Sequence, residues 1–276
     1  MKRLVLLATV TLLVNALSAQ IPFSNNMNTF FSQTNPAFAS VQDYSAVTIG
    51  RKSFEFYNSS LVQAQLHSTL GNFYVAISNN RNSLFDYSDG RVELGYSNGY
   101  KIKNWIFAGG IDINFGHAKL FSGAARNSIN FVNSDFGLLV KYRNVYLGFS
   151  ATNINLSGDQ LYYEYFNASL VHQINLNKNV GIHYAIMLRD GNDNRPRSYA
   201  LAGIRYKRLE LGLGLQYFLK SYGKNPSCYA AYSFKKCRIS YNYLRENWNG
   251  YNWHQHEIGF QFAFNTKGKE VSFLPF

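Results

Sequence analysis

The sequence predicts an all-β fold, a transmembrane antiparallel β-barrel of about 14 strands. Apolar and polar residues alternate with a period of two along nearly the whole chain, which is the pattern of strands with two different faces. The alternating segments are joined in turn by tight turns and by longer polar links. Aromatic residues make up 17% of the chain and charged residues only 15%, below the roughly 25% of an ordinary soluble domain. A membrane accommodates such an aromatic, weakly charged surface.

Composition excludes several other classes. A chain this rich in Tyr and Phe is not intrinsically disordered, and β-formers outnumber good helix formers, which argues against a soluble helical enzyme. Past the N-terminus there is no run of about 18 apolar residues, so helical membrane spans are excluded. The mean hydropathy of −0.21 fits a β-barrel, because its lumen-facing residues are polar.

The N-terminus predicts a secretory signal peptide over residues 1–19. Lys2 and Arg3 are the charged region, Leu4–Val14 the apolar region, and Ala16–Ala19 the small residues at the cleavage site. We expect residues 20–44 to be a periplasmic N-terminal segment, residues 45–264 the transmembrane barrel, and residues 265–276 a periplasmic C-terminal tail. Export through a cleavable signal peptide and a barrel pattern together predict an outer-membrane location.

The strands are predicted one by one from the alternation. In the clearest of them, Leu209, Leu211, Leu213, Leu215 and Tyr217 share one face, and small or polar residues share the other. The full set is Ser45–Phe54, Val62–Leu70, Asn72–Asn79, Arg91–Tyr100, Trp105–Gly116, Ser134–Tyr142, Val145–Ile154, Glu164–Leu176, Val180–Leu188, Arg197–Tyr206, Leu209–Leu219, Ser227–Lys235, Arg238–Arg245 and His256–Phe264. Such lengths suit tilted strands that cross a bilayer.

The connections strengthen this prediction. Short turns such as Arg143-Asn144 and Lys207-Arg208 alternate with longer links such as His117–Asn133 and Asn155–Tyr163. Outer-membrane barrels have short periplasmic turns and longer external loops, so both chain ends are expected on the periplasmic side. Aromatic residues near the strand ends predict either an interfacial girdle or a sugar-stacking surface; they are Tyr162, Tyr163, Tyr165, Phe166, Trp248, Tyr251 and Trp253.

The two cysteines are expected at opposite ends of neighbouring strands, too far apart to form a disulfide. Cys228 and Cys237 are therefore interpreted as two unpaired thiols. An intermolecular or hairpin disulfide is the alternative, because an exported protein enters an oxidising compartment.

Motifs at both ends of the chain resemble a known family. The segment from Phe31 to Ser40 reads F-S-Q-T-N-P-A-F-A-S, and the closing strand His256–Phe264 reads H-E-I-G-F-Q-F-A-F. Both resemble the PorP/SprF family of outer-membrane proteins, with Phe31, Asn35, Pro36 and Ala37 as the family motif. The stretch from Arg51 to Phe54 departs from the family's R-x-Q-W element, and between the two ends only the architecture matches.

The resemblance implies a function that composition does not. It implies an accessory β-barrel of the type IX protein secretion or gliding machinery, which supports export or surface attachment of a large secreted adhesin. The implied partners are periplasmic subunits of that machinery and the adhesin, in addition to outer-membrane lipid and the outer-membrane insertion machinery. In the last strand, Gly259, Phe262 and Phe264 have a spacing that resembles the barrel-assembly signal read by the insertion machinery.

Residues near the N-terminal motif carry a physical prediction of their own. Asn35-Pro36 disfavours a helix, so the segment from Phe30 to Phe38 is expected to be irregular. Its aromatic residues Phe30, Phe31 and Phe38 either plug the periplasmic mouth, bind a partner, or pack against the barrel rim.

Basic residues concentrate at the predicted periplasmic turns of a chain whose formal net charge is +12. They predict a positive rim that binds an acidic partner, or, as the alternative, turns made soluble by charge. No nucleic-acid partner is expected, since the charge does not follow a groove-reading helix. The predicted partner-binding residues are Lys101, Lys103, Lys141, Arg143, Lys178, Lys207, Arg208, Lys235, Lys236 and Arg238.

Nothing in the sequence predicts catalysis, a metal site or a cofactor. The histidines are scattered, and His254 with His256 is the only close pair. Inside the barrel, Asp112, Glu93 and Glu210 are expected to face the lumen and pair with Arg205 and Arg189. Besides the secretion role, the sequence leaves open an outer-membrane channel for small solutes or lipids. A barrel hydrolase, which needs only a few residues, is a third alternative.

Overall fold

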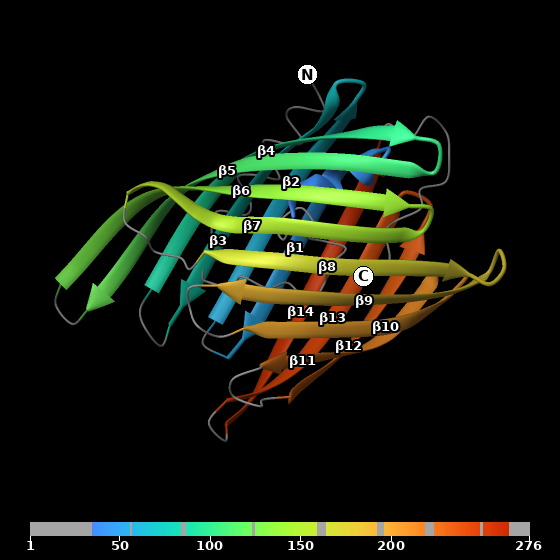
Figure 1. Cartoon of the computed structure of the whole chain (residues 1–276). Coiled ribbons are helices and arrows are strands. Elements are labelled where there is room, and N and C mark those ends of the chain that lie inside the picture. The colour runs from blue at the N-terminus through green and yellow to red at the C-terminus, as the bar shows by residue number, and fades with distance from the viewer. Residues whose placement is uncertain are drawn as a thin grey trace.

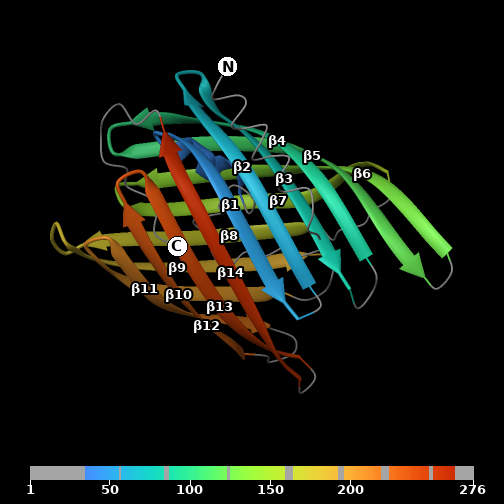
Figure 2. The ribbon, with the colours of Figure 1, turned by 180° about the vertical axis from the view of Figure 1, so that it is seen from behind.

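The chain forms a closed barrel of antiparallel strands, seen from two sides in Figures 1 and 2. The computed structural model describes residues 35–55, 57–83, 87–122, 125–158, 164–191, 196–218, 224–248 and 251–264. Every strand pairs with its neighbours in sequence, and β14 pairs with β1 to close the barrel, with Gly259 opposite Gly50. The predicted fold class, a transmembrane antiparallel barrel of 14 strands, is confirmed.

The elements follow one another without insertion. They are η1 (Pro36–Val41), β1 (Ser45–Phe54), β2 (Tyr57–Ser68), β3 (Gly71–Asn82), β4 (Tyr87–Ile102), β5 (Trp105–Ser122), β6 (Ala125–Tyr142), β7 (Val145–Gly158), β8 (Tyr165–Asn175), β9 (Val180–Gly191), β10 (Arg197–Tyr206), β11 (Leu209–Phe218), β12 (Lys224–Phe234), β13 (Cys237–Trp248) and β14 (Tyr251–Phe264). The single short helix described, η1, is a 3-10 turn. No helix in the described ranges has the length and apolar character needed to cross a membrane.

Several strands are longer than the sequence pattern predicts. β10 has the predicted bounds, but β5 and β6 continue into the segment expected to be a link, where Leu120 pairs with both Tyr87 and Asn127. Their hairpin projects beyond the rest of the barrel (Figure 1). Polar residues in this segment lack the apolar alternation that marks a membrane strand, yet their backbones still pair.

The two faces of each strand differ as a membrane barrel requires. On β11, Leu211 and Leu213 point outward and are 52% and 72% exposed, whereas Glu210 points inward and is 4% exposed. Comparable apolar side chains are exposed on the other strands, from Ile49 to Phe262. Since polar and charged residues occupy the inward positions, this outward apolar belt is the lipid-facing surface.

One end of the barrel, here called the turn end, is closed by tight turns. Two-residue turns join β4 to β5, β6 to β7, β10 to β11 and β12 to β13. An aromatic girdle lies beside them: the Trp105 and Tyr142 ring centroids are 4.4 Å apart, and Lys207 lies over the ring of Tyr206. The opposite end is called the link end.

The girdle predicted from the sequence is different from this one. Tyr165 faces the lumen and is 4% exposed, which its predicted interfacial place does not allow, whereas Phe166 faces outward. Tyr162 and Tyr163, and the side chains of Trp248, Tyr251 and Trp253, lie outside the description. Cys228 and Cys237 are both free and lie at opposite ends of the β12–β13 pair, as predicted.

Candidate functional site

The inner wall of the barrel is built by aromatic side chains that lie flat over glycines of the adjacent strand. Tyr74 of β3 covers Gly95 of β4, where an added Cβ would overlap the tyrosine ring. From there the Tyr74 hydroxyl donates to Asp112 Oδ2 on β5 at 2.7 Å. A glycine at this position therefore lets one side chain reach across a strand to a partner on the next.

The same arrangement recurs elsewhere on the wall. Phe131 of β6 lies over Gly116 of β5, and the guanidinium of Arg91 on β4 is 5.7 Å from the phenylalanine ring centroid. On the opposite wall, Tyr229 of β12 lies over Gly212 of β11 and contacts His183 of β9.

The N-terminal segment enters the lumen and docks on this wall. We call residues 35–41, which comprise η1 and its N-cap, the strap. The Asn35 side-chain oxygen caps the 3-10 turn by accepting from the Ala37 backbone N–H at 3.0 Å. The Asn35 amide nitrogen donates to the backbone carbonyls of Leu138 and Phe149, each at 3.1 Å. Both views place the blue turn between the two walls of the barrel (Figures 1 and 2).

Small residues of the wall make room for the strap. Added Cβ atoms at Gly110 and Gly137, which pair directly across β5 and β6, would overlap Pro36, Ala37 or Asn35. At its other end, the Ala39 carbonyl accepts from the side-chain amides of Gln65 and Asn72 on β2 and β3. The strap thus crosses the inner wall from β7 to β2, in the half of the lumen nearer the turn end.

This placement decides one of the sequence-based alternatives. Phe38 is 1% exposed and belongs to an inward apolar cluster that includes Leu139, Tyr146 and Met187, so it lies in the lumen and not against the rim. The segment is a 3-10 turn where the sequence predicted irregular structure, because Asn35 caps it and Pro36 takes the first helical position. Phe30 and Phe31 lie outside the described residues.

An acidic patch lies next to the strap, on its link-end side. It consists of Glu93 on β4, Asp112 on β5 and Asp135 on β6. Asp112 and Asp135 are opposite each other in register, and the three carboxylates act on one another electrostatically. Each lies two residues along its strand from an inward glycine, Gly95, Gly110 or Gly137.

Hydrogen bonds hold two of these carboxylates in place. Asp112 accepts from Tyr74 and, at 2.9 Å, from the Asn114 amide. Asp135 Oδ1 accepts from the Asn153 backbone N–H at 2.6 Å. The register between β6 and β7 shifts beside Asp135, and Asn153 has a φ of 59°. This irregularity turns a backbone donor toward the lumen, which a regular strand pair does not do.

The other side of the lumen corrects the predicted charge pairing. Glu93, Asp112 and Glu210 face inward as predicted, but Glu210 pairs with Arg238 at 3.0 Å and not with Arg205. Ala231 of β12 lies between the two strands in register, and its small side chain leaves room for Arg238 to reach Glu210. Arg205 donates to Asn175, and Arg189 donates to Asn167.

Most of the predicted partner-binding residues do lie exposed at the turn end. They are Lys101, Lys103, Arg143, Lys178, Lys207, Arg208, Lys235 and Lys236. Lys141 is less exposed and lies over the ring of Tyr146 inside the rim. Arg238 is 2% exposed and points into the lumen, so its inclusion was wrong: its inward position follows from strand parity one residue past the turn.

The residues of the predicted assembly signal lie on the closing strand. Gly259 faces inward, opposite Gly50, whereas Phe262 faces lipid and is 41% exposed. Phe264 is paired with Ser45, where β14 meets the start of β1. Residues 265–276 of the predicted tail, and residues 1–34 with the predicted signal peptide, lie outside the description.

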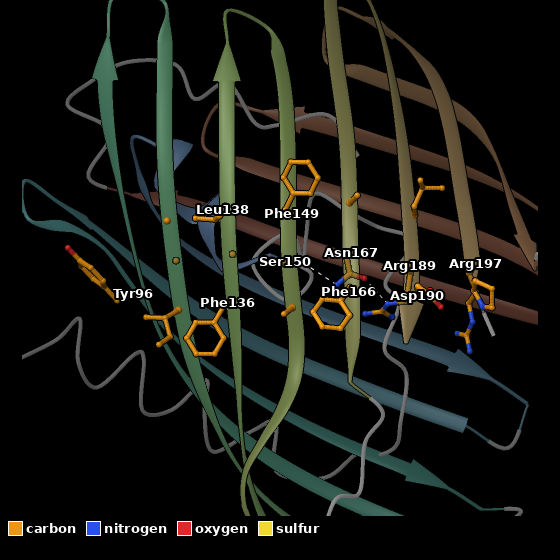
Figure 3. A pocket seen from close by; sticks show the side chains of 18 of the residues that line it. Tyr96, Phe136, Leu138, Phe149, Ser150, Phe166, Asn167, Arg189, Asp190 and Arg197 are labelled. Atoms are coloured by element: carbon orange, nitrogen blue, oxygen red, sulfur yellow. Dashed lines mark hydrogen bonds between the residues drawn. The ribbon is translucent and has the colours of Figure 1, made fainter. Parts of the chain in front are cut away.

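A hollow of about 1050 Å³ lies on the outer face over β4 to β10. Figure 3 shows Phe136, Phe149 and Phe166 projecting at it from three neighbouring strands. Gly109, Ala151 and Ala168 are also among its lining residues. On the inner side of the same strands, Asn167 links Ser150 to Arg189 through two hydrogen bonds (Figure 3). The hollow belongs to the lipid-facing surface.

No arrangement for metal-ion catalysis is found in the described part of the chain. No three His, Cys, Asp or Glu side chains there are placed to coordinate a metal ion directly. The close pair His254 and His256 faces outward, and each ring contacts a tyrosine of β13, Tyr243 and Tyr241 respectively.

Comparison of the sequence with models of known protein families finds no match, and neither does comparison with curated proteins. Solved structures with a similar trace include a KdgM porin, with a TM-score of 0.42 and 10% identity, over 80% of this chain and 99% of the porin. A KdgM porin in complex with disordered oligogalacturonate has a TM-score of 0.41 and 12% identity at the same coverage. A mutant Rh. blastica porin follows at 0.39 and 7%, also over 80% and 99% of the two chains.

Proposed function

We propose that this protein is an outer-membrane channel for small hydrophilic solutes, narrowed from within by the strap. The observation that carries the proposal is the chemistry of the inner wall. Polar and charged side chains occupy inward positions on every side of the closed barrel, from Thr48 on β1 to Gln261 on β14. A barrel interior that served only as a packed core would have no need of them.

Unpartnered polar atoms indicate that this interior holds water. Glu93 Oε1, Ser97 Oγ and Thr152 Oγ1 are buried and have no hydrogen-bond partner within the protein. Leaving such a group unsatisfied costs about 1–3 kcal/mol, so groups of this kind are normally bonded to ordered water. All three lie on β4 and β7, beside the strap or beyond it toward the link end. Water at these positions would be part of a hydrated path.

Conductance across a planar bilayer tests the proposal. The protein, folded into detergent and inserted into the bilayer, should give discrete current steps in KCl. We expect the steps to be small because the strap and the apolar cluster around Phe38 occupy part of the lumen. A barrel that inserts, resists heat-induced unfolding in gel shift, and passes no ions would contradict the channel.

A second candidate function rests on the exposed basic turns. The turn end carries eight exposed Lys and Arg side chains, and in outer-membrane barrels the short turns face the periplasm. A positive rim attracts an acidic periplasmic partner. The resemblance of the end motifs to the PorP/SprF family would make that partner a subunit of type IX secretion machinery, and the passenger a large adhesin. This role has no support beyond the motifs and the rim.

Charge reversal tests the second candidate. Replacing Lys207, Arg208, Lys235 and Lys236 by Glu should abolish co-purification of periplasmic partners from gently solubilised membranes, while the barrel still inserts. The matched control reverses Lys119 and Lys224, which lie toward the link end. Partners that remain bound to the four-residue variant at wild-type levels would rule out the basic turns as a docking surface.

A further inference from the structure

The charge buried inside the barrel is opposite in sign to the charge of the whole chain. The chain has a formal net charge of +12. Among the described residues, the buried charged side chains are six carboxylates against three cations. They are Asp89, Glu93, Asp112, Asp135, Glu210 and Glu257 against Lys52, Arg189 and Arg238. The excess of basic residues thus lies on the surface, and the lumen has an excess of acidic ones.

The acidic excess is not spread evenly over the wall. Glu210 has its own cation, Arg238, at 3.0 Å. Asp89 has Arg91 at 3.3 Å. By contrast, the described hydrogen bonds to Asp112 and Asp135 come from the neutral groups of Tyr74, Asn114 and the Asn153 backbone. The acidic patch Glu93, Asp112 and Asp135 therefore holds three neighbouring carboxylates without a bonded cation of its own.

Two polar atoms at the patch point to a missing ligand. Glu93 is 8% exposed, and its Oε1 has no hydrogen-bond partner in the protein. Thr152 is 2% exposed and faces inward on β7, next to Asp135 at the register shift, and its hydroxyl also has no partner. A carboxylate oxygen and a hydroxyl oxygen are both ligands of hard cations or of their hydration water.

Nearby cations do not neutralise the patch. Arg91 is bonded to Asp89 and lies against Phe131. Arg189 is bonded to Asn167, and its guanidinium is 4.1 Å from the ring centroid of Tyr165. Both act on Asp135 only through space. Three carboxylates in a water-poor wall repel one another, and a mobile cation relieves that repulsion.

We infer that the acidic patch Glu93, Asp112 and Asp135 is a binding site for small hydrated inorganic cations, and that it makes the channel cation-selective. The inference rests on the proposed function, because selectivity requires a conducting lumen. The cation is held with its hydration shell, since no three acidic side chains are placed to coordinate a metal directly. Such a site is weak enough for an ion to leave again, which permeation requires.

The strap gives the site its place in the path. Gly110 and Gly137, on which the strap docks, are two residues from Asp112 and Asp135 on the turn-end side. An ion that crosses the barrel must pass the strap, and the carboxylates lie beside that narrowing. Charge has its largest effect on permeation where a low-dielectric constriction focuses its field.

The reversal potential in a KCl gradient tests the inference. The wild-type barrel should favour K⁺ over Cl⁻ by about tenfold or more, as expected for a focused field. The variant Glu93→Gln/Asp112→Asn/Asp135→Asn keeps side-chain shape and should lose most of that preference. A variant with Asp112→Glu and Asp135→Glu keeps the charge and should remain cation-selective. The matched control, Asp43→Asn/Glu55→Gln/Asp190→Asn, removes three exposed carboxylates and should leave selectivity unchanged.

Luminescence of Tb³⁺ gives a readout that does not require conduction. Tyr74 is bonded to Asp112, so excitation of tyrosine should sensitise Tb³⁺ at the patch, and the three-residue neutral variant should lose that signal. A barrel that conducts with the same selectivity in the neutral variant and the wild type would overturn the inference while leaving the channel intact. A barrel that does not conduct would refute the channel, and Tb³⁺ luminescence equal in both proteins would then refute the cation site as well.

Discussion

At the residue scale, inward glycines determine which side chains meet inside the barrel. Tyr74 contacts Asp112 only because Gly95, on the strand between them, has no side chain. The sequence shows these glycines as one face of an alternating strand, but it does not show which aromatic ring covers each of them. That depends on the stagger of neighbouring strands, and on the rotamer that each ring adopts.

The variant Gly95→Ala tests this role. A Cβ at Gly95 would overlap the Tyr74 ring, so the ring must move and its hydrogen bond to Asp112 must lengthen or break. We expect the barrel to lose about 1–3 kcal/mol of unfolding free energy, the usual cost of overpacking a filled site. Urea-induced unfolding in lipid vesicles, followed by tryptophan fluorescence, measures the change.

Gly90 on the same strand supplies the control. An added Cβ there meets nothing within 4 Å, so Gly90→Ala should change the unfolding free energy by only a few tenths of a kcal/mol. Equal losses in both variants would mean that glycine flexibility in β4, and not the close approach of Tyr74, is responsible.

At the element scale, the alternation of side chains predicts the strands because lipid and lumen impose opposite chemistry on successive residues. It predicts β10 to the residue, Arg197–Tyr206, where both ends are marked by the change from apolar alternation to turn residues. It fails for the link-end parts of β5 and β6, which extend as a hairpin of polar residues with no lipid on either side. Their backbone pairing leaves no apolar pattern in the sequence.

Pairing between elements was predicted less well than the elements themselves. Glu210 was expected to pair with Arg205 or Arg189 and pairs instead with Arg238, two strands away across Ala231. One signal was available: with a two-residue turn between Tyr142 and Val145, and Trp105 opposite Tyr142, the register places Gly110 opposite Gly137. Two inward glycines side by side mark a hollow in the wall, and the strap fills it.

At the scale of the whole molecule, the strap connects an N-terminal motif to the properties of the lumen. Asn35 makes three of the strap's described hydrogen bonds, one as the cap of η1 and two to the carbonyls of Leu138 and Phe149. If the strap narrows the path, then releasing it should widen the path without unfolding the barrel, since the fourteen strands close on one another without it.

The variant Asn35→Asp separates these roles. A carboxylate can still cap η1, but it has no N–H to donate and would face two backbone carbonyls with a negative charge, which costs about as much as an unsatisfied buried charged group, some 3–5 kcal/mol. We therefore expect the strap to undock and the single-channel conductance to rise, while the barrel keeps its gel mobility. Ser40→Ala, which removes one hydrogen bond within the strap, should leave the conductance near that of the wild type. An Asn35→Asp barrel that inserts normally and conducts no more than the wild type would mean that the docked segment does not limit the path, and that the narrowing lies among the inward side chains of the wall itself.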